Sequence, residues 1–154
     1  MANETCIECG RDDYRKPSVT VDAVALRESA NGAEVLMIKR GKYPPEWEGK
    51  WAFPGGFVDY GENPEDAVIR ELKEETSVEG SNPVSLAILG EPGRDPRKHC
   101  VGLFYIVDVE PNCEPKAGDD AVDAAWVSIE LLNPKDVAGD HIKIINMLTD
   151  MLKE

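Results

Sequence analysis

The segment 63–76 constrains the fold most, because it carries the signals that start a long α-helix. The stretches on either side of it carry no such helix-start signals. Asn63 is a residue type that caps helices, and Pro64 suits the first helical position. Glu65 and Asp66 add negative charge to the first turn, where the helix dipole favours it. The rest of the chain must therefore supply surfaces against which this one helix can pack.

β-rich runs lie on both sides of this helix, at residues 19–26, 35–38, 84–89, 101–109 and 124–129. A turn-like stretch at 29–32 predicts a hairpin between the first two runs. Residues 41–61 are interrupted by prolines and glycines, which predicts a loop. Apolar residues three and four apart over 140–153 predict a second, amphipathic helix. This order predicts an α/β fold, a mixed β-sheet sandwiched between α-helices.

Length and charge restrict the class of protein. A chain of 154 residues normally forms one domain, which we place at 18–154 after a polar arm at 1–17. The 30 acidic and 17 basic residues give a net charge of -13, and no Lys/Arg block offsets it, so we expect no nucleic-acid partner. No apolar run resembles a membrane span or a secretory leader, so we expect no membrane partner and a cytoplasmic location.

Three carboxylates crowd one face of the predicted helix: Glu71, Glu74 and Glu75. Like charges at spacings of three and four destabilise a helix by about 0.2–0.5 kcal/mol per pair, and Lys73 points elsewhere. A hard divalent cation such as Mg²⁺ would convert this repulsion into a binding site. The alternative is an acidic face that is simply solvated.

The surrounding residues resemble the signature of the Nudix hydrolases. Gly56 is followed after five residues by Glu62 and, after seven more, by the run Arg-Glu-Leu-Lys-Glu-Glu-Thr-Ser-Val at 70–78. Eight of the nine specified positions match; at the ninth, Ser77 stands where the family has glycine. The lead-in at 49–56 is also similar to the family's. Because glycine there supplies a left-handed helix end, the departure concerns the turn and not the chemistry.

The resemblance implies a Nudix fold and roles for residues of this signature. Glu71, Glu74 and Glu75 would hold catalytic Mg²⁺ or Mn²⁺, and Arg70 would orient a glutamate. Glu62 would support the site from the loop. The backbone at Gly55 and Gly56 would approach the metal and the diphosphate, because no side chain intervenes. The implied reaction is hydrolysis of a nucleoside diphosphate linked to another moiety, in which the metal activates water and stabilises the leaving phosphate.

A later loop, 116–126, supplies further carboxylates. Some family members place a metal-binding or basic carboxylate about six residues before a tryptophan, and Asp120 is the match here, with Asp119 beside it and Trp126 after it. A turn that satisfies only its own backbone is the alternative for Asp120. Trp126 fits a core position better than a substrate-stacking one.

The loop 94–99 and the late loop are together similar to those of compact ADP-ribose pyrophosphatases. Arg94 and Arg97 suit phosphates or ribose hydroxyls, as Arg40 suits a phosphate, although each could be a solvated surface residue; His99 fits a structural role better. The implied reaction converts ADP-ribose to AMP and ribose 5-phosphate, and related compact enzymes are often homodimers. The alternatives are a house-cleaning pyrophosphatase for non-standard nucleoside triphosphates and an ADP-ribose sensor without turnover; the complete signature favours turnover.

Cys6 and Cys9 resemble half of a zinc ribbon. A structural zinc site needs four ligands, and Cys100 and Cys113, at opposite ends of a predicted strand, cannot be assumed to complete it. We expect an arm with reduced thiols, with zinc or a disulfide as alternatives.

Overall fold

The computed structural model describes residues 3–5, 12–14, 16–119 and 121–153, with the backbone alone for 3–5 and 12–14. In the N-terminal arm, β1 (Asn3–Thr5) and β2 (Asp12–Tyr14) pair as an antiparallel two-stranded sheet. Cys6, Cys9 and Asp120 lie outside the described residues, so the zinc alternatives and the position of Asp120 stay predictions.

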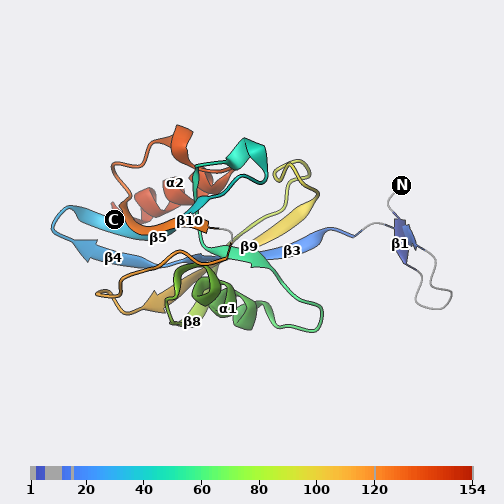
Figure 1. The fold of residues 1–154 in the computed structure, drawn as a ribbon, viewed down its shortest axis with the longest axis horizontal. Helices are drawn as coiled ribbons and strands as arrows, with labels where there is room; N and C mark the ends of the chain where they lie inside the picture. The colour runs from blue at the N-terminus through green and yellow to red at the C-terminus, as the bar shows by residue number, and fades with distance from the viewer. Residues whose placement is uncertain (1–2, 6–11, 15, 120, 154) are drawn as a thin grey trace.

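Two four-stranded sheets form the body of the protein (Figure 1). The first has the order β7-β3-β9-β8, with bounds Gly55–Phe57, Ser18–Val24, Cys100–Val109 and Gly80–Leu89. Its β3 and β9 run parallel, so this sheet is mixed. The second has the order β10-β5-β4 with β6 paired to β5, and the bounds Ala121–Ser128, Gly32–Arg40, Leu26–Ser29 and Trp51–Ala52.

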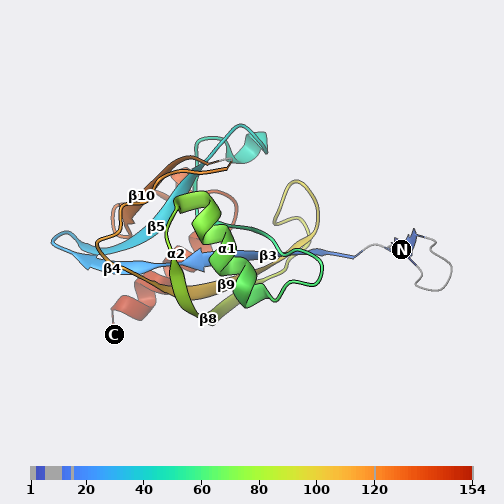
Figure 2. The same ribbon diagram turned by 60° about the horizontal axis from the view of Figure 1, so that its bottom comes forward.

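Two helices enclose the sheets, α1 (Pro64–Thr76) and α2 (His141–Leu152), and they lie on opposite sides of the strands (Figures 1 and 2). Short 3-10 turns, η1 (Pro45–Trp47) and η2 (Pro134–Asp136), occupy loops. The predicted fold class is confirmed. Among the described residues, neither helix is long and apolar enough to cross a membrane.

The alternation of side chains along the strands explains this sandwich. In β3, Val21 and Ala23 pack with the α1 residues Val68 and Leu72, whereas Val24 points to the opposite face and packs with Ile144 of α2. β5 and β9 divide their side chains between the two helices in the same way. Both faces of the central strands are therefore buried, and the polar residues among them must face a cavity or each other.

The predicted hairpin is wrong in its first strand. The chain changes sheets at Ala25, so β3 pairs with β7 and β9, while the true hairpin joins β4 to β5. The Ala25 carbonyl accepts from the N–H of Leu36 at 3.0 Å, which holds the crossing point. The predicted loop 41–61 is also partly ordered, since it contributes η1, β6 and β7. These pairings depend on distant strands that local patterns do not specify.

Both ends of α1 follow the sequence signals. Asn63 Oδ1 accepts from the N–H of Glu65 at 2.9 Å, which satisfies one of the free donors at the helix start. At the other end Ser77 is left-handed, with φ 63°, and its N–H bonds to the Lys73 carbonyl at 2.9 Å. A residue with a Cβ is strained in this conformation, as the sequence predicts.

A Ser77→Gly substitution is expected to raise the free energy of unfolding by about 0.5–1 kcal/mol, because glycine adopts positive φ without steric cost. Urea denaturation followed by circular dichroism measures the change. Ser85→Gly is the matched control: Ser85 is exposed within the extended strand β8, where glycine should destabilise the protein. A loss of stability in Ser77→Gly equal to that of the control would contradict the assignment of strain.

Candidate functional site

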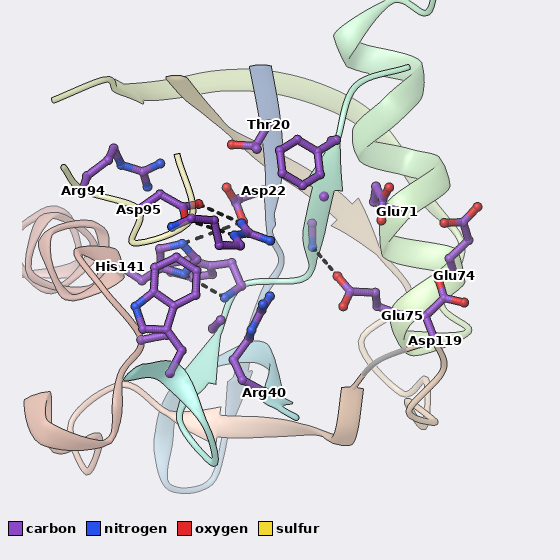
Figure 3. Close-up of a pocket in the computed structure, with 18 of the residues that line it drawn as sticks. Thr20, Asp22, Arg40, Glu71, Glu74, Glu75, Arg94, Asp95, Asp119 and His141 are labelled. Atoms are coloured by element: carbon purple, nitrogen blue, oxygen red, sulfur yellow. Dashed lines mark hydrogen bonds and ion pairs between the residues drawn. The ribbon is translucent and has the colours of Figure 1, made fainter. Parts of the chain in front are cut away.

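A cavity of about 330 Å³ lies between α1, the strands β3 and β7, and the start of α2. Figure 3 shows the acidic side chains of α1 at one end and His141 at the other. Of the ten site residues predicted from the sequence, eight line this cavity: Arg40, Gly55, Gly56, Glu71, Glu74, Glu75, Arg94 and Arg97. The structure therefore brings together residues that are up to 57 positions apart in the chain.

Arg70 stands behind the cavity and organises three glutamates. Its Nε and Nη2 donate to the two carboxylate oxygens of Glu62 at 2.7 and 2.9 Å, and its Nη1 donates to Glu71 Oε1 at 2.9 Å and Glu74 Oε2 at 3.1 Å. The paired hydrogen bonds of Arg70 lower the pKa of Glu62 to about 2. One guanidinium thus offsets the repulsion predicted between Glu71 and Glu74.

Glu75 is held by the backbone of β7. Its side chain is buried, and Oε1 accepts from the N–H of Gly55 at 2.7 Å. Burial raises its pKa to about 7, although the hydrogen bond from Gly55 opposes the shift. Burial also raises the pKa of Glu71. A positive ion beside these carboxylates would offset the cost of burying their charges.

Gly56 leaves room that a side chain would fill. A Cβ at this position would lie 2.5 Å from Glu71 Cδ and 2.6 Å from Oε2, much closer than real Cβ atoms approach. A Cβ at Gly55 would clash with the backbone of β3. Gly56 is therefore required for the close approach of α1 to β7, and Gly55 for the close approach of β3 to β7.

The carboxylates supply oxygen donors, the ligand type that Mg²⁺ prefers. Within residues 16–119 and 121–153, no three acidic, histidine or cysteine side chains lie close enough to hold an ion in their present positions. Each of the three glutamates on α1 nevertheless has only one oxygen bonded to a described residue. Among the described residues, nothing donates a hydrogen bond to Glu71 Oε2, Glu74 Oε1 or Glu75 Oε2. The donor set fits a divalent cation once these side chains turn toward it.

Arg40 and Arg97 give the cavity a positive side. Their guanidinium groups lie 5.3 and 5.5 Å from the Trp47 ring centroid, so the indole supports both. Arg97 also bonds Asp95 at 2.7 Å, whereas the Arg40 guanidinium donates, within the described part of the chain, only to the Tyr43 carbonyl, at 3.3 Å. Arg40 is thus the cavity arginine with the most donors left for an anion among the described residues.

Arg94 differs from the other two arginines. It forms two parallel hydrogen bonds to Asp140, at 2.9 and 2.8 Å, and its side chain is only 7% exposed. This ion pair ties the loop before β9 to the start of α2. Arg94 therefore lines the cavity with its charge already balanced by Asp140. The sequence does not reveal this ion pair.

The late loop crosses the end of α1. The N–H groups of Lys116 and Gly118 bond the carbonyls of Thr76 at 2.8 Å and Glu75 at 3.0 Å, and this positions Asp119 at the cavity. Trp126 lies elsewhere, as expected of a core residue: it packs against the α1 core, and Arg27 lies 4.4 Å from its ring centroid. His99 bonds the Gly90 carbonyl at 2.9 Å, a structural contact.

Asp22 and His141 are cavity residues that the sequence analysis missed. Asp22 lies on β3, where burial raises its pKa to about 8, and His141 opens α2, where burial lowers its pKa to about 4. A carboxylate inside the apolar run 19–24 was the available signal for Asp22. The sequence contains no comparable signal for His141, because a single histidine at the start of a helix does not by itself indicate a binding site.

A family model described as NUDIX domain matches residues 16–148. An ADP-ribose pyrophosphatase from Methanocaldococcus jannaschii is 41% identical over 132 residues, which are 86% of this chain and 73% of that protein. The crystallised NUDIX domain of Shewanella oneidensis NrtR, complexed with ADP ribose, is 27% identical with a TM-score of 0.80, covering 90% of each chain. A MutT/nudix family protein from Enterococcus faecalis is 34% identical with a TM-score of 0.78, covering 90% of this chain and 64% of that one.

These similarities extend over the whole cavity and not only over the helix that carries the signature. They cover both sheets, the glutamates of α1 and most of α2. With the signature, the fold and the relatives in agreement, the chain belongs to the Nudix family and is a Nudix hydrolase.

Proposed function

We propose that this hydrolase cleaves the diphosphate of ADP-ribose to give AMP and ribose 5-phosphate, with Mg²⁺ or Mn²⁺ as cofactor. The observation that carries the proposal is one cavity with the glutamates of α1 at one end and Arg40 and Arg97 on its side. Such a cavity suits a diphosphate between cations and arginines. The 41% identity to a protein named ADP-ribose pyrophosphatase supports the choice of substrate.

The proposed metal ligands are Glu71, Glu74, Glu75, the Gly55 carbonyl and Asp120. Bound divalent cations supply charge neutralisation of the diphosphate and a water of lowered pKa. Arg70 holds one oxygen of Glu71 and one of Glu74, which leaves the second oxygen of each for the metal. Arg40 and Arg97 orient the phosphates through their guanidinium donors. Because Gly56 has no side chain, the Glu71 carboxylate can lie directly against β7.

Asp120 is our proposed general base as well as a ligand. Support comes from its neighbour Asp119, which lines the cavity from the same loop. The hydrogen bonds that tie this loop to the carbonyls of Thr76 and Glu75 keep it beside the glutamates.

A sensor without turnover is the second candidate, because it requires only the binding of ADP-ribose that the complex of the Shewanella oneidensis domain illustrates. A triphosphate pyrophosphatase is the third, because it would use the same glutamates. In each case the partner is a small nucleotide. A homodimer and a cytoplasmic location belong to the same proposal, as does the division between an arm at 1–17 and a catalytic domain at 18–154.

Substitution of Glu74 tests the proposed metal role. Glu74→Gln removes a negative charge from a side chain that is 43% exposed, so the fold should persist while kcat falls more than about 100-fold, beyond the usual effect of a supporting residue. Glu65→Gln is the matched control, because Glu65 lies exposed in the first turn of the same helix, outside the cavity. Phosphate release from ADP-ribose with coupled phosphatase measures both. Near-native activity in Glu74→Gln would reject the assignment.

A substrate panel separates the candidate functions. The panel contains ADP-ribose, NADH, dinucleoside polyphosphates, sugar nucleotides and 8-oxo-dGTP, each with Mg²⁺ or with EDTA. We expect ADP-ribose to give the highest kcat/KM and EDTA to abolish turnover. A preference for the triphosphate would replace the proposed substrate. Calorimetric binding of ADP-ribose without hydrolysis at any metal concentration would establish the sensor instead.

A further inference from the structure

His141 lies at the end of the cavity away from the glutamates, and Asp22 lies between His141 and Gly55, the residue whose N–H holds Glu75 (Figure 3). Asp22 comes from the central strand β3, and His141 from the first turn of α2. Neither residue belongs to the signature at 56–78, and neither has a part in the proposed diphosphate chemistry. Two buried polar side chains with no assigned role therefore remain to be explained.

The His141 ring is fixed in position and in tautomer. It packs between Phe53 and Phe104, with both ring centroids 5.3 Å away. The N–H of Phe53 donates to His141 Nδ1 at 3.2 Å, so Nδ1 carries no proton. The proton of the neutral ring is consequently on Nε2. This N–H has no acceptor within hydrogen-bond distance among the described residues.

A candidate partner is Asp22 Oδ1, which lies 3.9 Å from Nε2. This separation exceeds a hydrogen bond, but one oxygen atom placed to the side can lie about 2.8 Å from both atoms. Such an oxygen must accept from Nε2–H and form a second hydrogen bond with the carboxyl group of Asp22. A hydroxyl group does both.

The free atoms of this pair are open to the cavity. Ser128 Oγ is the sole sealed side-chain oxygen or nitrogen without a partner in the part of the chain that the structure describes, so the unbonded atoms of Asp22 and His141 are accessible. Thr20 lies two residues before Asp22 on the same face of β3 and also lines the cavity. The cavity wall around Asp22 and His141 is therefore polar.

The charges at this end do not suit a phosphate. The nearby Arg94 is neutralised by its paired bonds to Asp140, and Arg40, the cavity arginine with free donors, acts on Glu75 as well as on Asp22. A phosphate at Asp22 would therefore share its cation with the glutamate end of the cavity. A neutral ligand that both donates and accepts hydrogen bonds fits better, and the sugars of the proposed substrate carry such groups.

We propose that Asp22 and His141 together bind one hydroxyl group of a ribose in the substrate and so determine specificity for the sugar. The inference rests on the proposed function, in which the diphosphate lies at the glutamate end. It makes Asp22 a binding residue of the cavity, while Phe53 and Phe104 position the imidazole.

Asp22→Ala and Asp22→Asn, each in the Glu74→Gln background with its slowed turnover, test the proposal by isothermal titration calorimetry. We expect the Kd of ADP-ribose to rise about 10- to 100-fold in Asp22→Ala, the usual effect of leaving a buried polar group without its hydrogen-bond partner. Asp22→Asn should lose less, because the amide oxygen still accepts. Inorganic pyrophosphate, which has no sugar, should bind both variants as it binds the background protein. Asp136→Ala, an exposed carboxylate outside the cavity, is the matched control.

Stability separates a binding role from a structural one. Asp22 is 8% exposed and accepts no hydrogen bond from the described residues, so its removal should leave Tm unchanged or raise it while affinity falls. A lowered Tm with unchanged ADP-ribose affinity would overturn the proposal, since the pair would then hold only a structural water. Equal losses for ADP-ribose and pyrophosphate would overturn it as well.

Two product fragments identify the sugar. AMP carries the nucleoside ribose and ribose 5-phosphate carries the other, so the fragment whose Kd rises in Asp22→Ala names the ribose that is bound. If the substrate panel shows a preference for another nucleotide, the proposed substrate is wrong but this inference is still tested. The same calorimetry is then carried out with that nucleotide. Loss of sugar-dependent binding is thus distinguishable from failure of the proposed reaction.

Discussion

The guanidinium of Arg70 is the contact on which the site depends. It joins Glu62 of the preceding loop to Glu71 and Glu74 of α1, and it also donates to the Phe57 carbonyl at 3.2 Å. Without a cation, carboxylates one turn apart would repel each other and weaken the helix. Arg70 thus holds α1 and the loop after β7 in a fixed relative position. It leaves one carboxylate oxygen of Glu71 and one of Glu74 free for other partners.

The central strand β3 connects this acidic end to the opposite end of the cavity. Its odd-numbered side chains, Val21 and Ala23, support α1, while Asp22 faces the cavity toward α2. One strand therefore positions both the helix that holds the glutamates and the carboxylate we assign to sugar binding. The packing that stabilises the fold also fixes the distance between the glutamates of α1 and Asp22.

Local patterns predicted the elements well where they were strong. The caps of α1, the amphipathic stripe of α2 and the run that became β9 are each encoded by residues close together in the chain. The first hairpin failed because Ala25 moves the chain between sheets, and alternation alone does not tell which strand is the neighbour. The arginines were found as a group, but the ion pair that neutralises Arg94 was not.

The sequence by itself determined the spacing of the glutamates, the family and the identity of most cavity residues. It could do so because helical periodicity and the family signature are both set by residues close together in the chain. Only the tertiary structure decided how these residues meet. It placed Asp22 opposite His141 and paired Arg94 with Asp140, residues 119 and 46 positions apart. Such pairs form because sheet pairing and burial bring distant segments together, and no local spacing records them.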